Sequence, residues 1–373
     1  MSVLPIAHER VVDLVPAAQA RVFLGPGHAH ETLAVPRVVL TPGEALVAVE
    51  LATICGSDVH TAEGHRAAPA PLVLGHEYVG RVVALGDGPV RTVDDRPVNI
   101  GDRVVWSILA ACNRCDRCER GLPQKCRSIL KYGHERVVDR AELRGGFATH
   151  VHLRTGTAIV RVGEDLPGEV LAPLACGTAT AFAALAAAEG ATPLAGATVL
   201  VTGAGLIGLT ATAIARDRGA RVIVSDPDPR RRERAVRFGA HAAVDPAQDP
   251  REILPQTEIT VVVEASGAPA AVTSALAVAG VGAVVVLVGS VFPAPPVALD
   301  AERVVRNLLT VRGVHNYGPD HLVAASRWLH GNGREHPLAE LVGATYPLSQ
   351  LDDALQVAST GAHVRVGVSP SAR

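Results

Sequence analysis

Lysine is almost absent from this 373-residue chain, and aromatic residues are few. Lys125 and Lys131 are its only lysines, so nearly all of the 35 basic side chains are arginines, and aromatics make up 3% of the residues. The 37 acidic side chains bring the net charge to −2, which implies no attraction to nucleic acid or to a membrane surface. With so few aromatics, the core must be built from Val, Leu, Ile and Ala, as in buried parallel strands.

Long hydrophobic runs are missing as well. The first ten residues, MSVLPIAHER, contain no apolar segment of the kind found in secretory signals. No apolar run free of Gly, Pro or charge is long enough to span a bilayer. We therefore expect a cytoplasmic protein whose six cysteines stay reduced. The length is sufficient for full hydrophobic cores and suggests two domains.

Four of the six cysteines are closely spaced, in the pattern C-x2-C-x2-C-x7-C. Cysteines three apart let consecutive thiolates fold around one tetrahedral ion, and four sulfurs leave no open coordination position. Two disulfides in a secreted domain are the alternative, which a reducing compartment disfavours. The segment 112–126 is therefore predicted to hold a structural zinc through Cys112, Cys115, Cys118 and Cys126.

A second set of soft ligands is scattered along the chain: Cys55, His76 and Cys176. Two thiolates and one imidazole fill three positions around zinc and leave the fourth for water or substrate, as a catalytic zinc requires. An isolated Cys is more often a core residue and a lone His more often a turn or surface residue. Here the surrounding motifs favour ligands, so we expect two zinc ions per chain.

The pattern of apolar residues and turn residues changes along the chain. Up to about residue 170, short β-branched runs alternate with Gly and Pro turns, which predicts an antiparallel, barrel-like domain. From about Pro173, strands alternate with Ala-rich helices, and this βαβ rhythm predicts a doubly wound parallel sheet. The expected domains are 1–172 with 316–373, and 173–315. Strands are expected at 38–40, 45–49, 78–85, 103–106, 198–202, 221–226, 259–264 and 283–288, helices at 206–218 and 230–239, and a strand returning to the first domain at 363–368.

A glycine-rich loop follows the predicted strand at 198–202 and opens a helix, which is the context that a dinucleotide-binding G-x-G-x-x-G requires. Gly203 permits a tight turn, Gly205 lets the backbone approach a pyrophosphate, and Gly208 lets helix and strand pack closely. Leu206 and Ile207 begin the helix, whose N-terminus favours the anion. These five residues are predicted to bind the cofactor.

Asp226 lies eighteen residues beyond Gly208, at the end of the next predicted strand. A carboxylate there accepts the ribose hydroxyls and repels a 2′-phosphate, which favours NAD over NADP. The alternative role for Asp226 is to cap a helix within Asp-Pro-Asp-Pro. Arg230 and Arg231 follow closely and could accommodate a 2′-phosphate, so they weaken the preference.

Together these motifs resemble the zinc-dependent medium-chain alcohol dehydrogenases. The chain has Cys-Gly-Ser-Asp-Val-His from Cys55, Gly-His-Glu at 75–77, the four-cysteine segment and the glycine-rich loop in that family's order, over essentially its whole length. The resemblance implies a GroES-like catalytic domain beside a Rossmann domain. It also implies hydride transfer between a zinc-bound alcohol and NAD, and a homodimer or homotetramer. A longer hairpin than usual at 87–99 departs from the family pattern at the surface.

The resemblance also assigns roles to single residues. Ser57 would take the substrate proton and His60 would pass it toward solvent, with His65, Asp58 and solvent as alternatives to His60. Glu77 would be a carboxylate near the catalytic zinc, or a transient ligand that competes with Cys176. The cofactor would be contacted at the nicotinamide by Thr180 and at the pyrophosphate by Arg365, in addition to Arg231 near the ribose.

The substrate is suggested by shorter stretches that resemble a subgroup associated with phosphonate metabolism, at 121–126, 131–135, 156–161 and 312–317. A phosphonate would need cations near the zinc. Polyols or simple secondary alcohols are the alternative, because the motif at Cys55 also resembles sorbitol and threonine dehydrogenases. A zinc-free quinone or enoyl reductase, or an inactive relative, would be expected to lack the ligands or Ser57. The candidate cations are Lys131, His134, Arg136 and His315.

Overall fold

The computed structural model describes residues 9–254 and 257–370. The first eight residues of the N-terminal segment, in which we expected no secretory signal, lie outside the described residues. The chain divides into two compact units. Unit 1 comprises residues up to 176, 318–326 and residues from 339 onward; unit 2 comprises 177–317 and 327–338. The sequence analysis placed the domain boundaries at 173 and 316. It did not predict that residues 327–338 would belong to the second unit.

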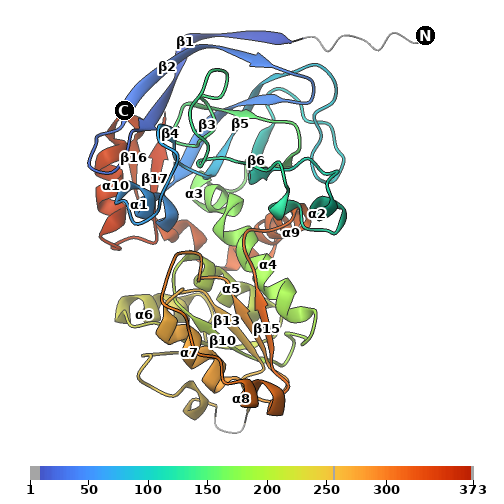
Figure 1. Ribbon diagram of the computed structural model, residues 1–373, viewed down its shortest axis with the longest axis vertical. Coiled ribbons are helices and arrows are strands. Elements are labelled where there is room, and N and C mark those ends of the chain that lie inside the picture. The colour runs from blue at the N-terminus through green and yellow to red at the C-terminus, as the bar shows by residue number, and fades with distance from the viewer. Residues whose placement is uncertain (1–8, 255–256, 371–373) are drawn as a thin grey trace, which may run out of the picture. The chain divides into compact units, whose positions relative to one another are not determined.

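Unit 1 is built on a largely antiparallel sheet with the order β16-β17-β3-β5-β6-β7, in which β8 also pairs with β3 and β9 with β6. β17 pairs antiparallel with β3, so the C-terminal tail returns to this unit as predicted (Figure 1). β16 and β17 are parallel to each other, which the expectation of an antiparallel domain did not include. The strands are β3 Ala45–Thr53, β5 Glu77–Leu85, β6 Arg103–Ala110, β7 Leu130–Lys131, β8 His150–Leu153, β9 Thr157–Arg161, β16 Val342–Pro347 and β17 Arg365–Ser369.

A smaller sheet with the order β2-β1-β4 completes the β-structure of unit 1. Val22, Leu40, Leu46 and Leu143 belong to one buried cluster that joins this sheet to the larger one. The burial of these aliphatic side chains supplies the hydrophobic stabilisation that a core poor in aromatics needs. The remaining elements are β1 Arg10–Phe23, β2 Glu31–Leu40, β4 Leu72–Val73, α1 Gly56–Ala62, α2 Asp116–Glu119, η1 Pro123–Lys125, α3 Gly168–Leu171, η2 Ala172–Ala175, η6 Leu348–Gln350 and α10 Leu351–Ser359.

Unit 2 contains a six-stranded parallel sheet with the order β12-β11-β10-β13-β14-β15. The order reverses between β10 and β13, and ligands of such sheets bind beyond the carboxyl ends of the strands at this reversal. The predicted glycine-rich loop follows β10 directly. The strands are β10 Thr198–Thr202, β11 Arg221–Ser225, β12 Ala242–Val244, β13 Val261–Glu264, β14 Val284–Leu287 and β15 Thr310–Gly313.

Helices cover both faces of this sheet. α5 and α6 connect strands that progress in one direction and α7 and α8 strands that progress in the other, so right-handed crossovers place the two pairs on opposite faces. Every residue of β10 is therefore buried, and Leu200, Val262 and Val285 pack with Ala275 of α7. The helices are α4 Gly177–Glu189, α5 Leu206–Asp217, α6 Pro229–Arg237, η3 Pro250–Glu252, α7 Pro269–Val278, α8 Ala301–Arg306 and η4 Asn332–Glu335, with α9 Pro319–His330 and η5 Leu338–Leu341 crossing between the units.

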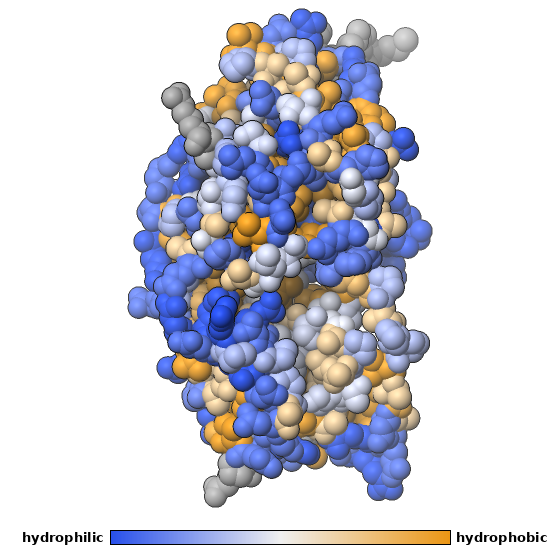
Figure 2. All heavy atoms as spheres, turned by 90° about the vertical axis from the view of Figure 1, so that its left-hand side faces the viewer, coloured by the Kyte–Doolittle hydropathy of each residue, from blue (hydrophilic) through white to orange (hydrophobic). Residues whose placement is uncertain are grey.

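The surface gives no sign of a broad apolar face on the side drawn in Figure 2, where hydrophilic and hydrophobic residues are interspersed. Within residues 9–254 and 257–370, no single helix is both long and apolar enough to cross a membrane.

Candidate metal centres and nucleotide site

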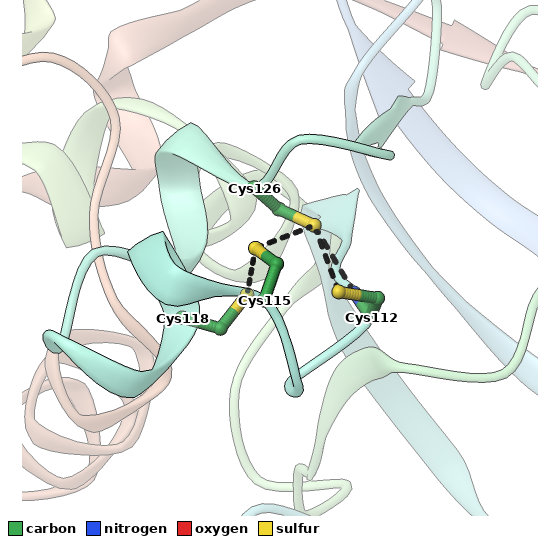
Figure 3. A group of neighbouring side chains, drawn as sticks. All are labelled: Cys112, Cys115, Cys118 and Cys126. Atoms are coloured by element: carbon green, nitrogen blue, oxygen red, sulfur yellow. Dashed lines mark hydrogen bonds between the residues drawn. The ribbon is translucent and has the colours of Figure 1, made fainter.

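The four closely spaced cysteines converge on one point (Figure 3). Cys115 is the N-cap of α2 and Cys118 lies within that helix, while Cys126 ends η1 and Cys112 follows β6. The sulfur of Cys115 lies 3.5 Å from that of Cys118 and 4.0 Å from that of Cys126, and the sulfurs of Cys126 and Cys112 are 3.4 Å apart. A tetrahedral zinc with bonds of about 2.3 Å needs sulfurs about 3.8 Å apart. The four thiols therefore fit a closed zinc site.

Backbone amides favour the thiolate form of Cys115 and Cys126, whereas burial raises the pKa of Cys118 to about 12. Hydrogen bonds from the N–H groups of Arg127, Cys118 and Arg117 lower the pKa of Cys115 to about 6, and the N–H of Cys112 donates to the sulfur of Cys126 over 3.3 Å. Arg127 also forms two hydrogen bonds to Asp116, of 2.5 and 2.9 Å, which tie the end of the segment to α2. Metal binding requires deprotonated sulfur, so these contacts favour an ion.

The scattered ligands also come together. One donor atom each of Cys55, His76 and Cys176 lies within 4.8 Å of the other two. Cys55 precedes α1, His76 precedes β5, and Cys176 ends η2, so three elements of unit 1 supply one ligand each. Gly75 has a φ of +90° and an added Cβ would lie 2.8 Å from the backbone nitrogen of Phe147, so only glycine brings His76 here. The three groups fit a zinc with one open position.

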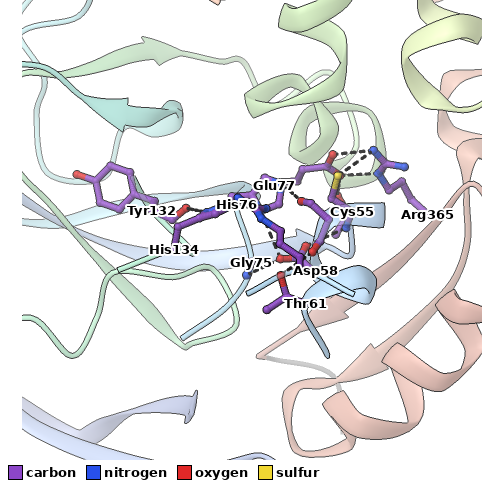
Figure 4. Close-up of polar contacts among 12 residues, drawn as sticks. Cys55, Asp58, Thr61, Gly75, His76, Glu77, Tyr132, His134 and Arg365 are labelled. Atoms are coloured by element: carbon purple, nitrogen blue, oxygen red, sulfur yellow. Dashed lines mark hydrogen bonds and ion pairs between the residues drawn. The ribbon is translucent and has the colours of Figure 1, made fainter. Parts of the chain in front are cut away.

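Asp58 fixes two of these ligands, as Figure 4 shows. Its carboxylate accepts hydrogen bonds from the N–H of Cys55 at 3.0 Å and the N–H of Gly75 at 3.2 Å, and it is 1% exposed. Its Oδ1 also lies 3.3 Å from Nδ1 of His76. A carboxylate behind a ligating imidazole orients the ring and leaves the other nitrogen for the metal. Asp58 is thus a partner of His76, a role that the sequence analysis missed.

The protonation states of the three groups follow from these contacts. Burial alone would lower the pKa of His76, but the charge of Asp58 and hydrogen bonds to Asp58 and Cys55 raise it to about 10. A hydrogen bond from Cys176 lowers the pKa of Cys55 well below its usual value, and the same contact, together with burial, raises that of Cys176. These pKa directions leave protons on His76 and Cys176, and a zinc ion would displace them, because both groups ligate only in the deprotonated form.

Glu77 is fully buried and belongs to a different contact network. It accepts a hydrogen bond from Thr53 at 2.6 Å and pairs with Arg365 at 2.7 and 2.9 Å. Arg365 also donates to the sulfur of Cys55 over 3.6 Å, and although burial alone would lower its pKa, Glu77 and Cys55 raise it. Glu77 is not among the three clustered ligands in the described residues. Its service as a transient ligand and the contact of Arg365 with the pyrophosphate stay predictions.

Ser57 and His60 both lie on α1, three residues apart. The hydroxyl of Ser57 is 3.3 Å from Nε2 of His76, which places it beside the metal ligands. His60 is in the last turn of the same helix, and residues three apart share one helix face. The geometry is compatible with a proton path from Ser57 to His60, and this path stays a prediction.

A group of basic residues lies against the metal ligands. The rings of His134 and His76 are 5.2 Å apart. Nδ1 of His134 is 2.9 Å from the carbonyl oxygen of Tyr132 and Nε2 is 3.0 Å from Nη1 of Arg66, so Nδ1 donates a proton and Nε2 accepts one. Both contacts require a neutral ring, and burial lowers the pKa of His134 well below its usual value. His134 therefore differs from the cation that the sequence suggested, and Arg66 supplies the charge instead.

Lys131 adds a second cation to this group. Burial, followed by the nearby charge of Arg66, lowers the pKa of Lys131 to about 8, while the thiols of Cys176 and Cys55 oppose the shift. In the part of the chain that the structure describes, its ammonium group makes no hydrogen bond. Arg136 is exposed, and His315 is an exposed residue of unit 2 that follows β15. Contact of either with a substrate stays a prediction.

The glycine-rich loop of unit 2 has the geometry expected for binding a pyrophosphate. Gly203 has a φ of +92°, and Gly205 is the N-cap of α5, which Leu206 and Ile207 begin. A Cβ added at Gly208 would collide with the carbonyl oxygen of Gly203, so helix and loop can pack this closely only through glycine. The open N-terminus of α5 offers its backbone N–H groups to an anion. Thr180 is buried on α4 of the same unit.

Asp226 follows β11 directly and is 2% exposed. Its carboxylate accepts from the N–H of Ala204, in the glycine-rich loop, at 2.7 Å, and from the N–H of Asp228 at 2.9 Å. The N-cap of α6 is Asp228, which accepts from the N–H groups of Arg230 and Arg231, so the alternative role of Asp226 as that cap is wrong. Arg231 is turned to Asp228 at 4.0 Å. Asp226 retains acceptor capacity for ribose hydroxyls.

Comparison with known proteins agrees with this geometry. Residues 41–164 match the family described as Alcohol dehydrogenase GroES-like domain, and residues 207–331 match the family described as Zinc-binding dehydrogenase. An L-threonine 3-dehydrogenase of Deinococcus deserti is 32% identical over 290 residues, 74% of this chain and 77% of the relative. A 5-exo-hydroxycamphor dehydrogenase of Pseudomonas putida is 29% identical over 90% of this chain and 94% of the relative.

Solved structures give the same result. An alcohol dehydrogenase from Thermotoga maritima superposes with a TM-score of 0.87 and 28% identity, over 95% of this chain and 99% of that protein. A zinc-binding dehydrogenase from Sinorhizobium meliloti, bound to NADP, has a TM-score of 0.81 and 26% identity over 95% and 99%. This chain belongs to the zinc-dependent medium-chain alcohol dehydrogenases. It is an alcohol dehydrogenase that uses zinc and a nicotinamide dinucleotide, as predicted.

Proposed function

We propose that this dehydrogenase uses NAD to oxidise a small alcohol that carries a phosphonate or a comparable anion, and that it reduces the matching carbonyl compound in the reverse direction. The observation that carries the substrate proposal is the pair of cations, Arg66 and Lys131, beside the metal ligands. Arg66 is held by the hydrogen bond to His134, whose ring lies against His76. An anionic group of a zinc-bound substrate would lie within reach of both.

The chemistry of the two cations suits a phosphonate or carboxylate. A guanidinium presents paired N–H donors to two oxygens of one anion, and an ammonium adds a point charge. Burial, and then the charge of Arg66, lowers the pKa of Lys131, so an anion between the two cations would offset both effects. Desolvation of the anion would be offset by these charge-assisted contacts, each worth about 1.5–3 kcal/mol.

The residues around the catalytic centre would divide the work of the reaction. Cys55, His76 and Cys176 would hold zinc, which supplies Lewis acidity that makes an alcohol proton removable near neutral pH and polarises a carbonyl in reverse. Ser57 would receive that proton, and His60 would carry it toward solvent along one face of α1. Asp58 would keep the ring of His76 in position.

The cofactor preference follows from Asp226. Its buried carboxylate at the end of β11 would accept the ribose hydroxyls and repel a 2′-phosphate, so we propose NAD as the main cofactor. The four-thiol site would hold a second, structural zinc. By family resemblance we also propose a homodimer or homotetramer that works in the cytoplasm.

A neutral secondary alcohol is the second candidate substrate, and the name of one of the two relatives supports it. 5-exo-Hydroxycamphor, named for the Pseudomonas putida relative, is a neutral secondary alcohol, whereas L-threonine, named for the other, carries a carboxylate. The first relative would support a neutral alcohol here and the second an anionic one.

The substrate proposal is tested with pairs of alcohols that share a carbon skeleton and differ only in a phosphonate. Wild type should prefer the phosphonate, and Arg66→Gln or Lys131→Gln should lower kcat/KM for it by about ten- to a hundredfold while changing the neutral partner little. The preference should also fade as pH rises through about 8, because Lys131 then loses its proton. Arg114→Gln, at an exposed arginine of the same unit that is not among the candidate cations, is the control. Equal kcat/KM for both alcohols in wild type would move the neutral substrate to first place.

A further inference from the structure

A third group of potential ligands lies at the C-terminal end of α1. One donor atom each of His60, Glu63 and His65 lies within 4.8 Å of the other two. Nδ1 of His65 is 3.3 Å from Oε2 of Glu63, and the two imidazole rings are 5.8 Å apart at 56° to one another. His60 lies on α1, the helix that Cys55 precedes, but the group uses none of the ligands of the two zinc sites described above.

The local backbone explains why these three side chains meet. His60 and Glu63 are three residues apart, and the N–H of Glu63 bonds to the carbonyl oxygen of Val59 at 2.9 Å, so the helical geometry extends to Glu63. Gly64 then reverses the chain with a φ of +80°. The N–H of Arg66 returns to the carbonyl oxygen of His60 at 3.0 Å. This closed turn sets His65 beside His60.

The donor set suits a transition-metal ion. Two imidazoles and one carboxylate are the protein ligands of a common class of zinc site. With Zn–N bonds of about 2.0–2.1 Å, two imidazoles on one tetrahedral ion have ring centres about 5 Å apart, so the observed spacing needs only a small side-chain adjustment. The side chains of His65 and Glu63 are 66% and 42% exposed, so an ion from solution can reach them.

We propose that His60, Glu63 and His65 form a third cation site, which binds a divalent transition-metal ion such as Zn²⁺, and that the bound ion withdraws His60 from proton transfer. The second part rests on the proposed function, in which His60 carries the substrate proton toward solvent. A ring nitrogen bound to a metal cannot accept a proton. The enzyme would then need zinc at two sites for activity and would lose activity when free zinc fills the third.

The binding test uses the enzyme with its two tight sites filled. Metal bound per chain is measured against buffered free Zn²⁺ for wild type, Glu63→Gln, His65→Gln and His28→Gln, the last an exposed histidine of the same unit outside the group. Wild type and His28→Gln should bind a further equivalent with equal affinity. Loss of a direct ligand should weaken binding at least as much as loss of an outer partner, about 10- to 100-fold. Absence of that equivalent, or equal binding by all four proteins, would overturn the site.

The inhibition test follows steady-state activity over the same range of free Zn²⁺, each protein being compared with its own activity at low zinc. Half-inhibition of wild type should coincide with filling of the third site and should move to higher zinc in Glu63→Gln and His65→Gln by the same factor as binding. Binding without inhibition would overturn the withdrawal of His60. His60→Gln, assayed at low zinc, reports on the proton path alone: full activity would reject that part of the proposed function whether or not the third ion binds.

Discussion

At the residue scale, the carboxylate of Asp226 is expected to set the preference for NAD over NADP. It lies between β11 and α6, and it also bonds to the N–H of Ala204 in the glycine-rich loop at 2.7 Å. Asp226→Ser removes both the charge and this contact, whereas Asp226→Asn removes the charge and leaves an oxygen that can accept from Ala204. If the charge selects the cofactor, both variants should raise the ratio of kcat/KM for NADP over NAD.

The expected loss with NAD is about ten- to a hundredfold for Asp226→Ser, since one contact to a charged group is worth about 1.5–3 kcal/mol. Asp249→Ser is the control, because it replaces a capping aspartate of the same unit outside α6 and the glycine-rich loop, and serine also caps helices. The readout is the rate of hydride transfer with each cofactor at saturating alcohol. A wild type that already prefers NADP would contradict the role given to Asp226.

The sequence could reveal those site residues that lie in short motifs, but not those whose partners are far away along the chain. The metal ligands lie in short motifs with fixed spacing, and the structure brings each predicted set together. Asp58 was considered only for the proton path, because its partners Gly75 and His76 lie about twenty residues away and no local pattern links them. Arg66 was missed for the same reason, since its partner His134 lies 68 residues away.

At the scale of elements, the segment 112–126 contains little regular secondary structure that could stabilise it without a metal ion on its four sulfurs. Its only regular structures are the four-residue α2 and the three-residue η1, too short to be stable alone. Zinc binding should therefore supply most of its folding free energy. Cys115→Ser should lower the zinc content by about one per chain and the Tm by about 5–10 °C.

Arg114→Gln, an exposed neighbour within the same segment, is the matched control and should change neither quantity. Metal analysis and thermal unfolding monitored by circular dichroism are the measurements. A Cys115→Ser protein with wild-type stability and zinc content would show that the four thiols do not hold a structural ion.

The elements that the sequence predicted are those with a strong periodic or continuous apolar signal. Buried runs gave β10, β11, β13 and β14, and the Ala-rich and Arg-rich stretches gave α5 and α6. β1 was missed because it lies in a three-stranded sheet, six of its fourteen residues are exposed, and Pro16 lies inside it. α1 was missed because it has only seven residues and lies in a segment rich in polar side chains. Short elements depend on tertiary contacts, which periodicity does not report.

At the scale of the whole molecule, the predicted ligands of the catalytic zinc and the predicted nucleotide-binding residues belong to different units. All three ligands of the catalytic group, with Ser57 and Asp58, belong to unit 1, whereas the glycine-rich loop and Asp226 belong to unit 2. A substitution that disrupts the catalytic zinc site should therefore leave nucleotide binding intact, and the reverse should also hold. A variant without the catalytic zinc should still bind the nucleotide, and this separation sets the most direct test.

That test compares wild type with Cys55→Ser for zinc per chain and NADH binding, with turnover measured on the same samples. Wild type should contain about two zinc ions and transfer hydride. Cys55→Ser should contain about one, bind NADH with nearly unchanged affinity, keep the far-ultraviolet spectrum of wild type, and show no turnover. Turnover by a Cys55→Ser protein that has lost one zinc, or a wild type active with a single zinc at the four-thiol site, would contradict a catalytic zinc at Cys55, His76 and Cys176.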